Sequence, residues 1–351
     1  MIRIATKQDI ENLLALYEQA RAFMGHNGLA QWQGGYPQKE IVENDVSAGH
    51  TRVFEENGEI LGCAAFIDRE PDYDVIYDGK WKTHGRFIAV HRVAVGARRK
   101  GIASAFFKEA LREAGRKGFA SVRIDTHKDN APMRAALEKN GFTYCGNIRL
   151  SRDGEWRVAY EKERPVLVAA TGNRGKLREI EELLPEYVIV SQKQAGFFGE
   201  AEENGNTFLE NAIIKARAAS EALQLPALAD DSGICCVALH GEPGIHSARY
   251  VGRHGDDAAN NALLLKNLEG KDRSAYFYCA VALVFPDGRI LSGEGKTDGY
   301  ILERAEGENG FGYDPLFFST ELNKPFGIAS AEEKNSVSHR YRALKELSEK
   351  L

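Results

Sequence analysis

The sequence predicts an α/β protein made of two consecutive domains. Runs with strand character alternate with runs of helical spacing in both halves of the chain. The chain has 351 residues, which is more than one hydrophobic core usually organises. A charged cluster that ends in a proline, Glu161–Pro165, has the composition of a short linker. We therefore expect one domain over residues 1–162 and a second over residues 165–351.

The composition is that of an ordinary globular protein, with 43% hydrophobic and 28% charged residues. The five cysteines form no Cys-x-x-Cys pair, which argues against a disulfide framework or zinc ribbon and favours a reducing cytoplasm. Charges interrupt the first residues, so no signal-peptide core is expected there. No apolar run approaches the roughly 20 residues that span a bilayer. We expect a cytoplasmic protein with no membrane partner.

Charge is shared unevenly between the two halves. The net charge of −5 divides into +2 for residues 1–163 and −7 for residues 164–351. Polyphosphate backbones are bound by basic patches, so the acidic second half argues against a nucleic-acid partner. A single triphosphate bridged by a divalent cation is compatible with that charge.

Each element expected in the first half rests on a local pattern. Residues 8–22 carry apolar side chains at helical spacing. Residues 51–66 are predicted to form a hairpin, because Asn57-Gly58 supplies a positive-φ turn between two apolar runs. The patterns that follow predict a strand over 87–95, a helix over 104–117, a strand over 121–125 and a helix over 131–140 that stops at Gly141.

The second half opens with a predicted strand over 166–170 and a helix over about 176–184. Thr207 and Glu210 have the spacing of a capping box for a helix over 208–223. A strand is expected over 276–285. Ser336 or Ser338 is expected to cap a last helix that runs to the C-terminus.

A basic loop with a glycine follows the strand predicted over 87–95. It reads Arg98-Arg99-Lys100-Gly101-Ile102-Ala103 and opens a helix, so its backbone N–H groups and basic side chains suit a pyrophosphate. Taken alone, it is equally consistent with a charged surface loop. Residues 1–160 resemble the GCN5-related N-acetyltransferase (GNAT) family in the order of their elements. That order is a helix, a hairpin, a strand, this loop, a helix, a strand and a last helix after Asp129-Asn130.

The GNAT resemblance implies a mixed, twisted sheet flanked by helices, an acetyl-CoA cofactor and an amine acceptor of unknown identity. It assigns Asn130 to the neighbourhood of the thioester, and the strand around Val93 and Val95 to the pantetheine arm. The remaining residues that it assigns to cofactor binding are Arg98, Arg99, Lys100, Gly101, Ala103 and Ser104.

One position departs from the GNAT pattern. Many members carry a tyrosine in the last helix that can protonate the leaving thiolate, and Leu137 stands at the corresponding position here. His127 and Tyr144 are the candidates in its place, although a lone histidine at a strand end is more often structural. The first domain is therefore either an N-acetyltransferase or a module that binds CoA without transferring acetyl groups.

In the second half, the run Ala229–Gly233 places two adjacent carboxylates, Asp230 and Asp231, between apolar stretches. Such a pair is costly because the charges repel and both are desolvated, so it indicates a cation at that place. Earlier, the glycine-containing turn Thr171–Lys176 puts a lysine at a helix start, where it suits phosphate oxygens, although the turn is not a Walker A loop. Together the two segments predict a metal-assisted enzyme that acts on a phosphate ester.

Further segments complete a pattern around the acidic pair. They are Glu202–Gly205, the helix with Lys215, Gly241–Tyr250, Gly310–Pro315 and Ser338–Arg340. In this order they resemble the Ham1/RdgB family of non-canonical purine nucleoside triphosphate pyrophosphatases over residues 165–351. The resemblance implies a Ham1-like α/β domain with an elongated mixed sheet and two lobes, a homodimer, and hydrolysis of ITP, dITP and XTP to the monophosphate and pyrophosphate.

The Ham1 resemblance also assigns roles to residues. Asp231 would bind Mg2+ and accept a proton from the attacking water, and one or both of Glu202 and Glu203 would complete the metal site. Lys215 is assigned to catalysis with Asp231, because its charge stabilises the leaving pyrophosphate. Asp230 is either a ligand or a support for one. The residues assigned to the nucleoside triphosphate are Thr171, Gly172, Asn173, Arg174, Gly175, Lys176, Ser232, Phe311, Gly312, Tyr313, Asp314, Lys334, His339 and Arg340.

Within that set, Phe311 or Tyr313 is expected to stack on a purine, while donors from Lys334, His339 or Arg340 meet a 6-keto oxygen. Adenine would leave those donors unpaired, and such a mismatch discriminates strongly. We therefore predict a bifunctional enzyme that combines an acetyltransferase with a pyrophosphatase for ITP, dITP and XTP. The alternative is a general nucleotide phosphohydrolase with a non-catalytic CoA-binding module at its N-terminus.

Overall fold

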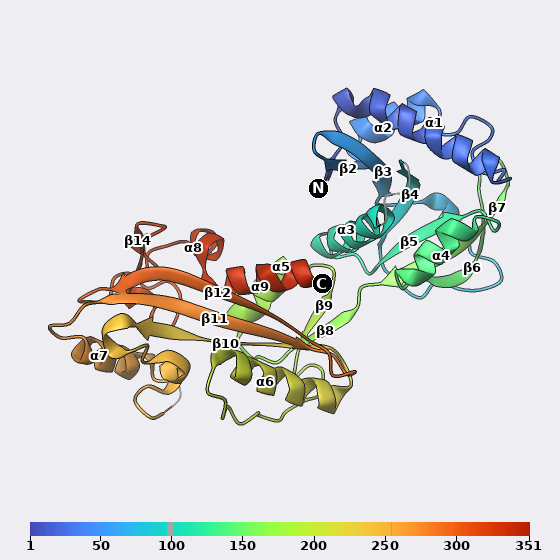
Figure 1. Ribbon diagram of the computed structural model, residues 1–351. Helices are drawn as coiled ribbons and strands as arrows, with labels where there is room; N and C mark the ends of the chain where they lie inside the picture. Colours follow the sequence, from blue (N-terminus) through green and yellow to red (C-terminus); the bar gives the residue numbers. More distant parts are fainter. Residues whose placement is uncertain (97–100, 254) are drawn as a thin grey trace. The chain divides into compact units, whose positions relative to one another are not determined.

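The computed structural model describes residues 1–96, 101–253 and 255–351, which divide into two compact units (Figure 1). The first unit comprises Met1–Pro165 with Pro185–Val188, and the second comprises Val166–Leu184 with Ile189–Leu351. Each unit is built around its own mixed sheet of seven strands. In the described part of the chain, no helix combines the length and apolar character needed to cross a membrane.

The first unit has the sheet order β1-β2-β3-β4-β5-β7-β6, in which β4 and β5 are parallel and the other neighbours antiparallel. Its strands are β1 (Ile2–Ile4), β2 (Thr51–Glu56), β3 (Glu59–Ile67), β4 (Phe87–Val95), β5 (Ser121–Thr126), β6 (Thr143–Arg149) and β7 (Trp156–Glu163). The α-helices described in it are α1 (Ile10–His26), α2 (Lys39–Ser47), α3 (Ile102–Arg116) and α4 (Ala131–Lys139).

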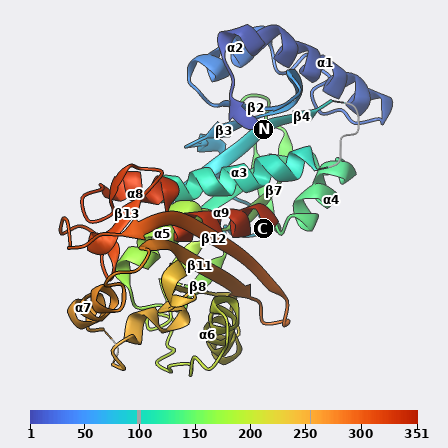
Figure 2. The same cartoon turned by 60° about the vertical axis from the view of Figure 1, so that its left-hand side comes forward.

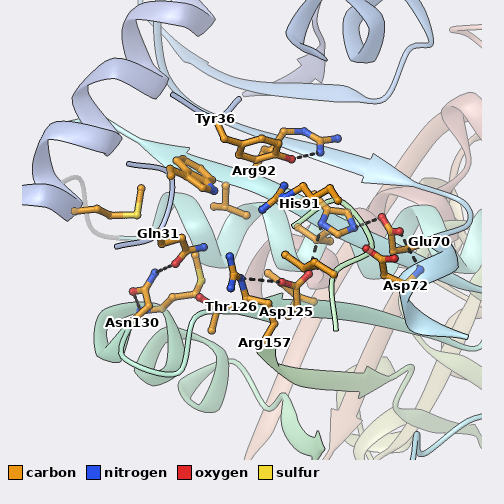
Figure 3. Close-up of a pocket in the computed structure, with 18 of the residues that line it drawn as sticks. Gln31, Tyr36, Glu70, Asp72, His91, Arg92, Asp125, Thr126, Asn130 and Arg157 are labelled. Carbon is orange, nitrogen blue, oxygen red and sulfur yellow. Dashed lines mark hydrogen bonds and ion pairs between the residues drawn. The ribbon is translucent and has the colours of Figure 1, made fainter. Parts of the chain in front are cut away.

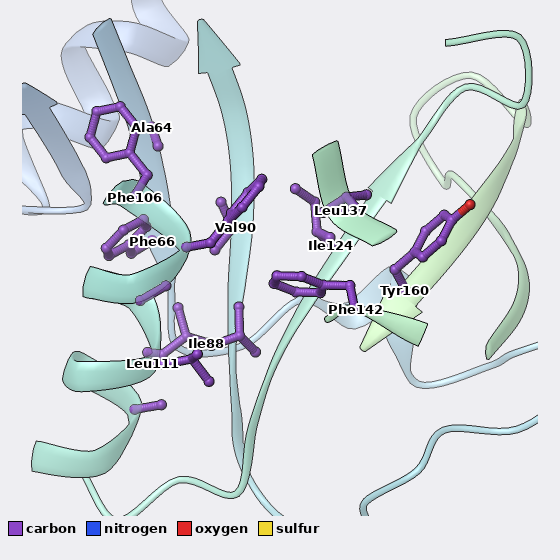
Figure 4. Close-up of a cluster of buried hydrophobic side chains, with 14 of the residues drawn as sticks. Ala64, Phe66, Ile88, Val90, Phe106, Leu111, Ile124, Leu137, Phe142 and Tyr160 are labelled. Carbon is purple, nitrogen blue, oxygen red and sulfur yellow. The ribbon is translucent and has the colours of Figure 1, made fainter. Parts of the chain in front are cut away.

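Helices cover both faces of the first sheet. α3 buries Phe106, Ala110 and Leu111, which recur at helical spacing, against Ile88 and Val90 of β4 (Figure 4). A second cluster joins α1 and α2 to residues of β2, β3 and β4. The predicted hairpin is confirmed: β2 and β3 pair antiparallel, and Asn57 and Gly58 both have positive φ, at 53° and 79°.

The second unit has the sheet order β14-β13-β12-β11-β10-β8-β9, in which β8 and β10 are parallel. Its strands are β8 (Val166–Ala169), β9 (Val188–Ser191), β10 (Ala227–Cys236), β11 (Ser274–Val284), β12 (Ile290–Ile301), β13 (Phe317–Ser319) and β14 (Lys324–Pro325). The α-helices described in it are α5 (Arg174–Leu183), α6 (Phe208–Leu223), α7 (Asp257–Asn267), α8 (Ala331–Val337) and α9 (His339–Lys350).

Two layers of helices enclose the long strands of the second sheet. α6 packs on β10 and β11, whereas α9 packs on β11 and β12 together with its neighbour α5 (Figure 2). The expected caps fall close to their predicted positions. The Thr207 hydroxyl accepts from Glu210 N at the start of α6, and the Ser338 hydroxyl accepts from Tyr341 N at the start of α9.

α9 lies close to the sheet because β12 has glycines beneath it. A Cβ at Gly295 would stand 2.0 Å from the His339 carbonyl oxygen and 2.6 Å from Ala343 N. A Cβ at Gly293 would stand 2.2 Å from the Ala343 carbonyl oxygen. The two glycines therefore fix how deeply α9 and its first residues, His339 and Arg340, sit over the sheet.

Replacing Gly295 by alanine should lower the free energy of unfolding of the second unit by about 1–3 kcal/mol, because the added methyl group must displace the α9 backbone. Scanning calorimetry would measure the change. The matched control is Lys296→Ala on the neighbouring exposed position, for which we expect a change within about 0.5 kcal/mol. Equal stability of the two variants would contradict the proposed packing.

Candidate active sites

The acidic pair of the second unit stands within a continuous strand. Asp230 and Asp231 are the fourth and fifth of the ten residues of β10, and both are buried. The parallel neighbour β8 pairs with β10 at Ala227 and Leu228 and ends at Ala169. The pair therefore begins just beyond the end of β8, where the turn toward α5 leaves the sheet.

Asp230 and Asp231 point to opposite faces of the sheet, because successive side chains alternate along a strand. Asp230 faces α5 and α9, where its Oδ2 lies 2.9 Å from Lys176 Nζ and 3.1 Å from Arg340 Nε. Asp231 faces α6, where its Oδ1 lies 3.0 Å from Lys215 Nζ. Each carboxylate of the pair therefore has its own basic partners, on opposite faces of the sheet.

Asp230 is the centre of a buried ion-pair network. Burial alone would raise its pKa, but the charges of Lys176 and Arg340 hold the pKa well below the usual range. Arg340 also donates to Ser232 Oγ at 3.2 Å and to Glu179 Oε2 at 3.2 Å. Asp230 therefore stays ionised and supports two basic side chains.

Asp231 has a different electrostatic environment. Burial raises its pKa above the usual value and the nearby Glu203 carboxylate adds to this, while the Lys215 ammonium only partly offsets the shift. Asn211 Nδ2 donates to its second oxygen at 3.2 Å. Asp231 is consequently a stronger base than an ordinary aspartate, as the role of a proton acceptor requires.

A cavity of about 680 Å³ lies beside the acidic pair, at the start of α5. Its lining includes Ala170, Thr171, Gly172, Lys176, Gln192, Phe197, Gly199, Glu200, Ala201, Glu203, Lys215, Asp230 and Arg249. Both lysines that the sequence assigned to the triphosphate therefore reach one cavity. Arg249 and Glu200 also line it, and sequence reasoning did not single them out as site residues.

Some residues of the predicted phosphate-binding turn cap or begin helix α5. Asn173 Oδ1 accepts from Gly175 N at 2.8 Å and from Lys176 N at 3.2 Å, so its side chain caps α5. Arg174 and Gly175 form the first turn of that helix, two residues earlier than expected. Glu202 is exposed and stands outside the described cavity lining, whereas Glu203 belongs to it.

A second, smaller cavity of about 120 Å³ adjoins the other end of this network. Its lining is Ser232, Gly233, Ser247, Ala248, Asp257, Phe277, Phe311, Gly312, Tyr313, Asp314, Lys334, His339 and Arg340. All the residues that the sequence assigned to the base pocket are present here. Arg340 lines this cavity and binds Asp230, which lines the larger one, so a single guanidinium connects the two.

The aromatic residues of the smaller cavity differ in how accessible their rings are to a ligand. Tyr313 is buried and donates its hydroxyl to the Ser247 carbonyl oxygen at 2.8 Å, so it belongs to the wall. Phe311 is 47% exposed, with Lys334 Nζ 5.0 Å from its ring centre. Phe311 is therefore the better candidate to stack on a flat ring.

His339 supplies an unused polar atom to the smaller cavity. Its ring stacks on Phe277 with 4.8 Å between centres, and its Nδ1 is buried with no hydrogen-bond partner among the described residues. Burial, together with the charges of Arg340 and Lys334, lowers the pKa of His339 well below its usual value. A neutral imidazole with an unpaired nitrogen can thus meet a polar edge of a ligand.

Glu203, which lines the larger cavity, and Asp231, which stands outside the described lining, are suited to a hard divalent cation. Glu203 Oε1 and Asp231 Oδ1 converge on Lys215 Nζ, each at 3.0 Å, so two carboxylates already meet at one positive charge. Among the described residues, no group of three or more acidic, histidine or cysteine side chains is placed to hold a metal alone. Two carboxylates completed by ligand phosphates and water are a usual arrangement for Mg2+.

The first unit has a cavity of about 310 Å³ where β4 and β5 separate (Figure 3). The strands pair at Phe87–Ala89 with Ser121–Arg123, and the cavity opens beyond this stretch. Its lining is Met24, Gln31, Trp32, Tyr36, Ile41, Glu70, Asp72, Val90, His91, Arg92, Val93, Ile124, Asp125, Thr126, Asn130, Met133, Leu150, Arg152 and Arg157.

The cofactor residues predicted for the first unit lie in different places. Val93 and Asn130 line the cavity, and Asn130 Oδ1 also caps α4 by accepting from Met133 N at 3.2 Å. Gly101, with a φ of 99°, precedes α3, and among the described residues no atom outside its chain neighbours stands within 4 Å of a Cβ built there. Ala103 and Ser104 lie in the first turn of α3, and Val95 ends β4. Arg98, Arg99 and Lys100 lie outside the described residues.

Leu137 and the two candidates for a proton donor to the leaving thiolate, His127 and Tyr144, stand outside the described lining of this cavity. Leu137 is fully buried in the core (Figure 4), so its position faces other apolar side chains. The Tyr144 hydroxyl is 3.3 Å from Asn147 Oδ1, and His127 Nδ1 accepts from Asp129 N at 3.3 Å. Neither belongs to the described lining. Sequence reasoning missed Glu70, His91 and Asp125, which do line it, because no motif joins them.

The fold defines the second unit as an α/β protein with two adjoining cavities, one lined by basic and acidic side chains and the other by aromatic and polar ones. Residues 167–350 match the family model described as the Ham1 family, and the chain belongs to that family. Residues 13–142 match the model of the acetyltransferase (GNAT) family, so a GNAT domain precedes the Ham1 domain.

Two relatives illustrate the Ham1 match. The dITP/XTP pyrophosphatase of Desulforamulus reducens is 50% identical over 188 residues, which cover 52% of this chain and 94% of the relative. The structure of the Ham1 protein of Staphylococcus aureus is 40% identical, covers 52% of this chain and 96% of its own, and has a TM-score of 0.50. For the first unit, a GNAT-family acetyltransferase structure from Streptococcus agalactiae is 36% identical, covers 46% of this chain and 94% of its own, and has a TM-score of 0.42.

Proposed function

We propose that the second unit hydrolyses non-canonical purine nucleoside triphosphates (ITP, dITP and XTP) between the α and β phosphates. The observation that carries this proposal is the pair of cavities joined by Arg340 and Asp230. One cavity offers lysines and carboxylates for a triphosphate, and the other offers an aromatic ring and hydrogen-bonding groups for a base. The names of the relatives, dITP/XTP pyrophosphatases, support the same reading.

In this proposal, the chain's own residues prepare the attacking water and the leaving group. Asp231, whose pKa is raised, accepts a proton from the water. Lys215, whose pKa the surrounding carboxylates raise despite burial, stays protonated and neutralises charge that develops on the phosphates together with Lys176. Asp230, which also pairs with Arg340, holds Lys176 at the phosphate end. Mg2+ held by Asp231 and Glu203 would add further positive charge at the triphosphate.

Selection of the base is assigned to the smaller cavity. The ring of Phe311 stacks on the purine, while donors from Lys334, His339 or Arg340 meet a 6-keto oxygen. Adenine has an amino group at that position and would leave those donors unpaired. We expect kcat/KM to be higher for ITP than for ATP by about 10²-fold or more.

Product analysis distinguishes this function from a general nucleotide phosphohydrolase. The full chain is incubated with Mg2+ and ITP, XTP, GTP or ATP, and nucleotides, pyrophosphate and orthophosphate are quantified. We expect inosine monophosphate and pyrophosphate in equal amounts from ITP and little turnover of ATP. Orthophosphate as the sole phosphate product, or equal rates with ATP, would refute the proposal. Chelation of the divalent cation is expected to stop the reaction.

We further propose that the first unit transfers the acetyl group of acetyl-CoA to an amine. Support comes from the GNAT match, from the opening between β4 and β5, and from Gly101 before α3, where among the described residues no atom outside its chain neighbours stands within 4 Å of a Cβ built there. Calorimetry with CoA, combined with thiol release over a panel of amines, tests the proposal. CoA binding without any thiol release would favour the alternative of a binding module. The homodimer rests on the Ham1 resemblance and is to be tested by sedimentation.

A further inference from the structure

The cavity of the first unit contains a group of ionisable side chains for which the proposed acetyl transfer has so far no role. His91 on β4 lies between two carboxylates. Its Nε2 is 3.0 Å from Glu70 Oε2 but is not aligned for a hydrogen bond, and its Nδ1 is 3.7 Å from Asp125 Oδ1. Figure 3 shows the three side chains converging, with Asp72 beside Glu70. An imidazole in contact with a carboxylate is an arrangement that can accept and release a proton.

These side chains are held in place by their neighbours. Tyr73 is buried and donates its hydroxyl to Asp125 Oδ1 at 2.7 Å. Asp72 N donates to Glu70 Oε1 at 3.2 Å, and Asp72 Oδ1 in turn accepts from Ser151 N at 3.1 Å. The group is therefore ordered, as a binding or catalytic site requires.

The lining of the cavity holds three carboxylates and three arginines, and carboxylates outnumber arginines once the outside partners of the arginines are included. Its three arginines already have carboxylate partners outside the lining: Arg92 pairs with Asp45 at 2.7 Å, Arg152 with Asp153 at 2.9 Å and Arg157 with Glu155 at 2.6 Å. Glu70 and Asp125 contact His91, Arg157 makes a longer contact of 4.0 Å with Asp125, and no ion pair of Asp72 is found among the described residues. A ligand with positive charge would improve this balance.

A second observation indicates that a ligand belongs here. Thr126 lines the cavity at the end of β5 and is 1% exposed, yet its Oγ1 has no hydrogen-bond partner among the residues that the structure describes. Leaving such a buried hydroxyl unpaired is unfavourable. A polar group of a bound molecule would satisfy it.

We propose that the acetyl acceptor of the first unit is a small aliphatic amine with a second positive charge, and that His91, paired with Glu70, accepts the proton that the amine loses. This inference rests on the proposed acetyl transfer. The ammonium gives one proton to His91, and the amine nitrogen then forms a bond to the acyl carbon. The carbon–sulfur bond of the thioester breaks, and the sulfur leaves as a thiol with the second proton of the nitrogen.

The carboxylates of Glu70 and Asp72 provide the selectivity in this proposal. They attract the second positive charge of the acceptor and repel an acceptor that ends in a carboxylate. The cavity of about 310 Å³ equals the volume of roughly ten water molecules, which suits a small molecule better than a segment of a folded protein.

Isothermal titration calorimetry of the full chain saturated with CoA tests the binding part. The probes are 1,4-diaminobutane and 4-aminobutanoate, which share the amine and differ in the charge at the far end. We expect the diamine to bind at least about tenfold more tightly, and Glu70→Gln and Asp72→Asn each to remove most of that preference without changing CoA affinity. The matched control is Asp74→Asn, which removes a carboxylate of the same segment that pairs with Arg69.

Thiol release with 1,4-diaminobutane tests the role of His91. We expect His91→Gln to lower kcat by about 10²-fold while the calorimetric affinity for the diamine changes by less than a few-fold. Equal affinity for both probes, or an unchanged kcat in His91→Gln, would overturn this inference and leave the proposed acetyl transfer standing. Failure of the chain to bind CoA would overturn the proposed acetyl transfer itself and this inference with it.

Discussion

Replacing Asp231 by asparagine is expected to lower kcat for ITP hydrolysis by about 10²–10⁴-fold, the usual contribution of a general base. The amide keeps the size of the side chain but cannot accept a proton. Lys215 retains Glu203 at 3.0 Å as a partner, so the variant should remain folded. Steady-state measurement of pyrophosphate release, together with a calorimetric melting curve, checks both expectations. Activity above a tenth of the wild-type value would remove Asp231 from its proposed role.

The same substitution at the neighbouring position should act on stability. Asp230→Asn leaves the buried Arg340 and Lys176 without the carboxylate that faces both, so the free energy of unfolding of the second unit should fall by about 3–5 kcal/mol. Thermal and urea unfolding measure the loss. The contrast follows from the alternation of side chains along β10, which gives adjacent carboxylates different partners.

A control for the Asp230 variant makes the same chemical change at the surface. Asp287 is exposed, and its contact with Arg289 is 3.9 Å long, so Asp287→Asn should change stability by less than about 0.5 kcal/mol. If Asp230→Asn were as stable as this control, the buried network would not have the role assigned to it.

Much of the fold could be predicted because its signals are local. The hairpin at Asn57-Gly58 and the helix cap at Ser338 each depend on a few consecutive residues, and the structure confirms them. The sequence did not indicate that Asp230 and Asp231 point to opposite faces of the sheet, because two carboxylates between apolar runs resemble a break between elements. The apolar residues on both sides were the available signal for one continuous strand, and strand periodicity then separates the pair.

The sites could be predicted only where a family motif covers them. Phe311, Lys334 and His339 were assigned through the Ham1 resemblance and line a single cavity, whereas the stacking alternative Tyr313 is held in the cavity wall by Ser247. In the first unit, Glu70, His91 and Asp125 come together through the pairing of the sheet and a short turn after β3. No spacing in the sequence indicates that contact, since it depends on tertiary structure.

The central claim is that one nucleotide occupies both cavities of the second unit. Calorimetric binding of pyrophosphate and of ITP in the Asp231→Asn background, with Mg2+ present, tests it most directly. Lys176→Gln should weaken both ligands by about tenfold, whereas Phe311→Ala should weaken ITP by about tenfold and leave pyrophosphate unchanged. If Phe311→Ala bound ITP as tightly as its parent, or if Lys176→Gln affected neither ligand, the two cavities would not form one nucleotide site.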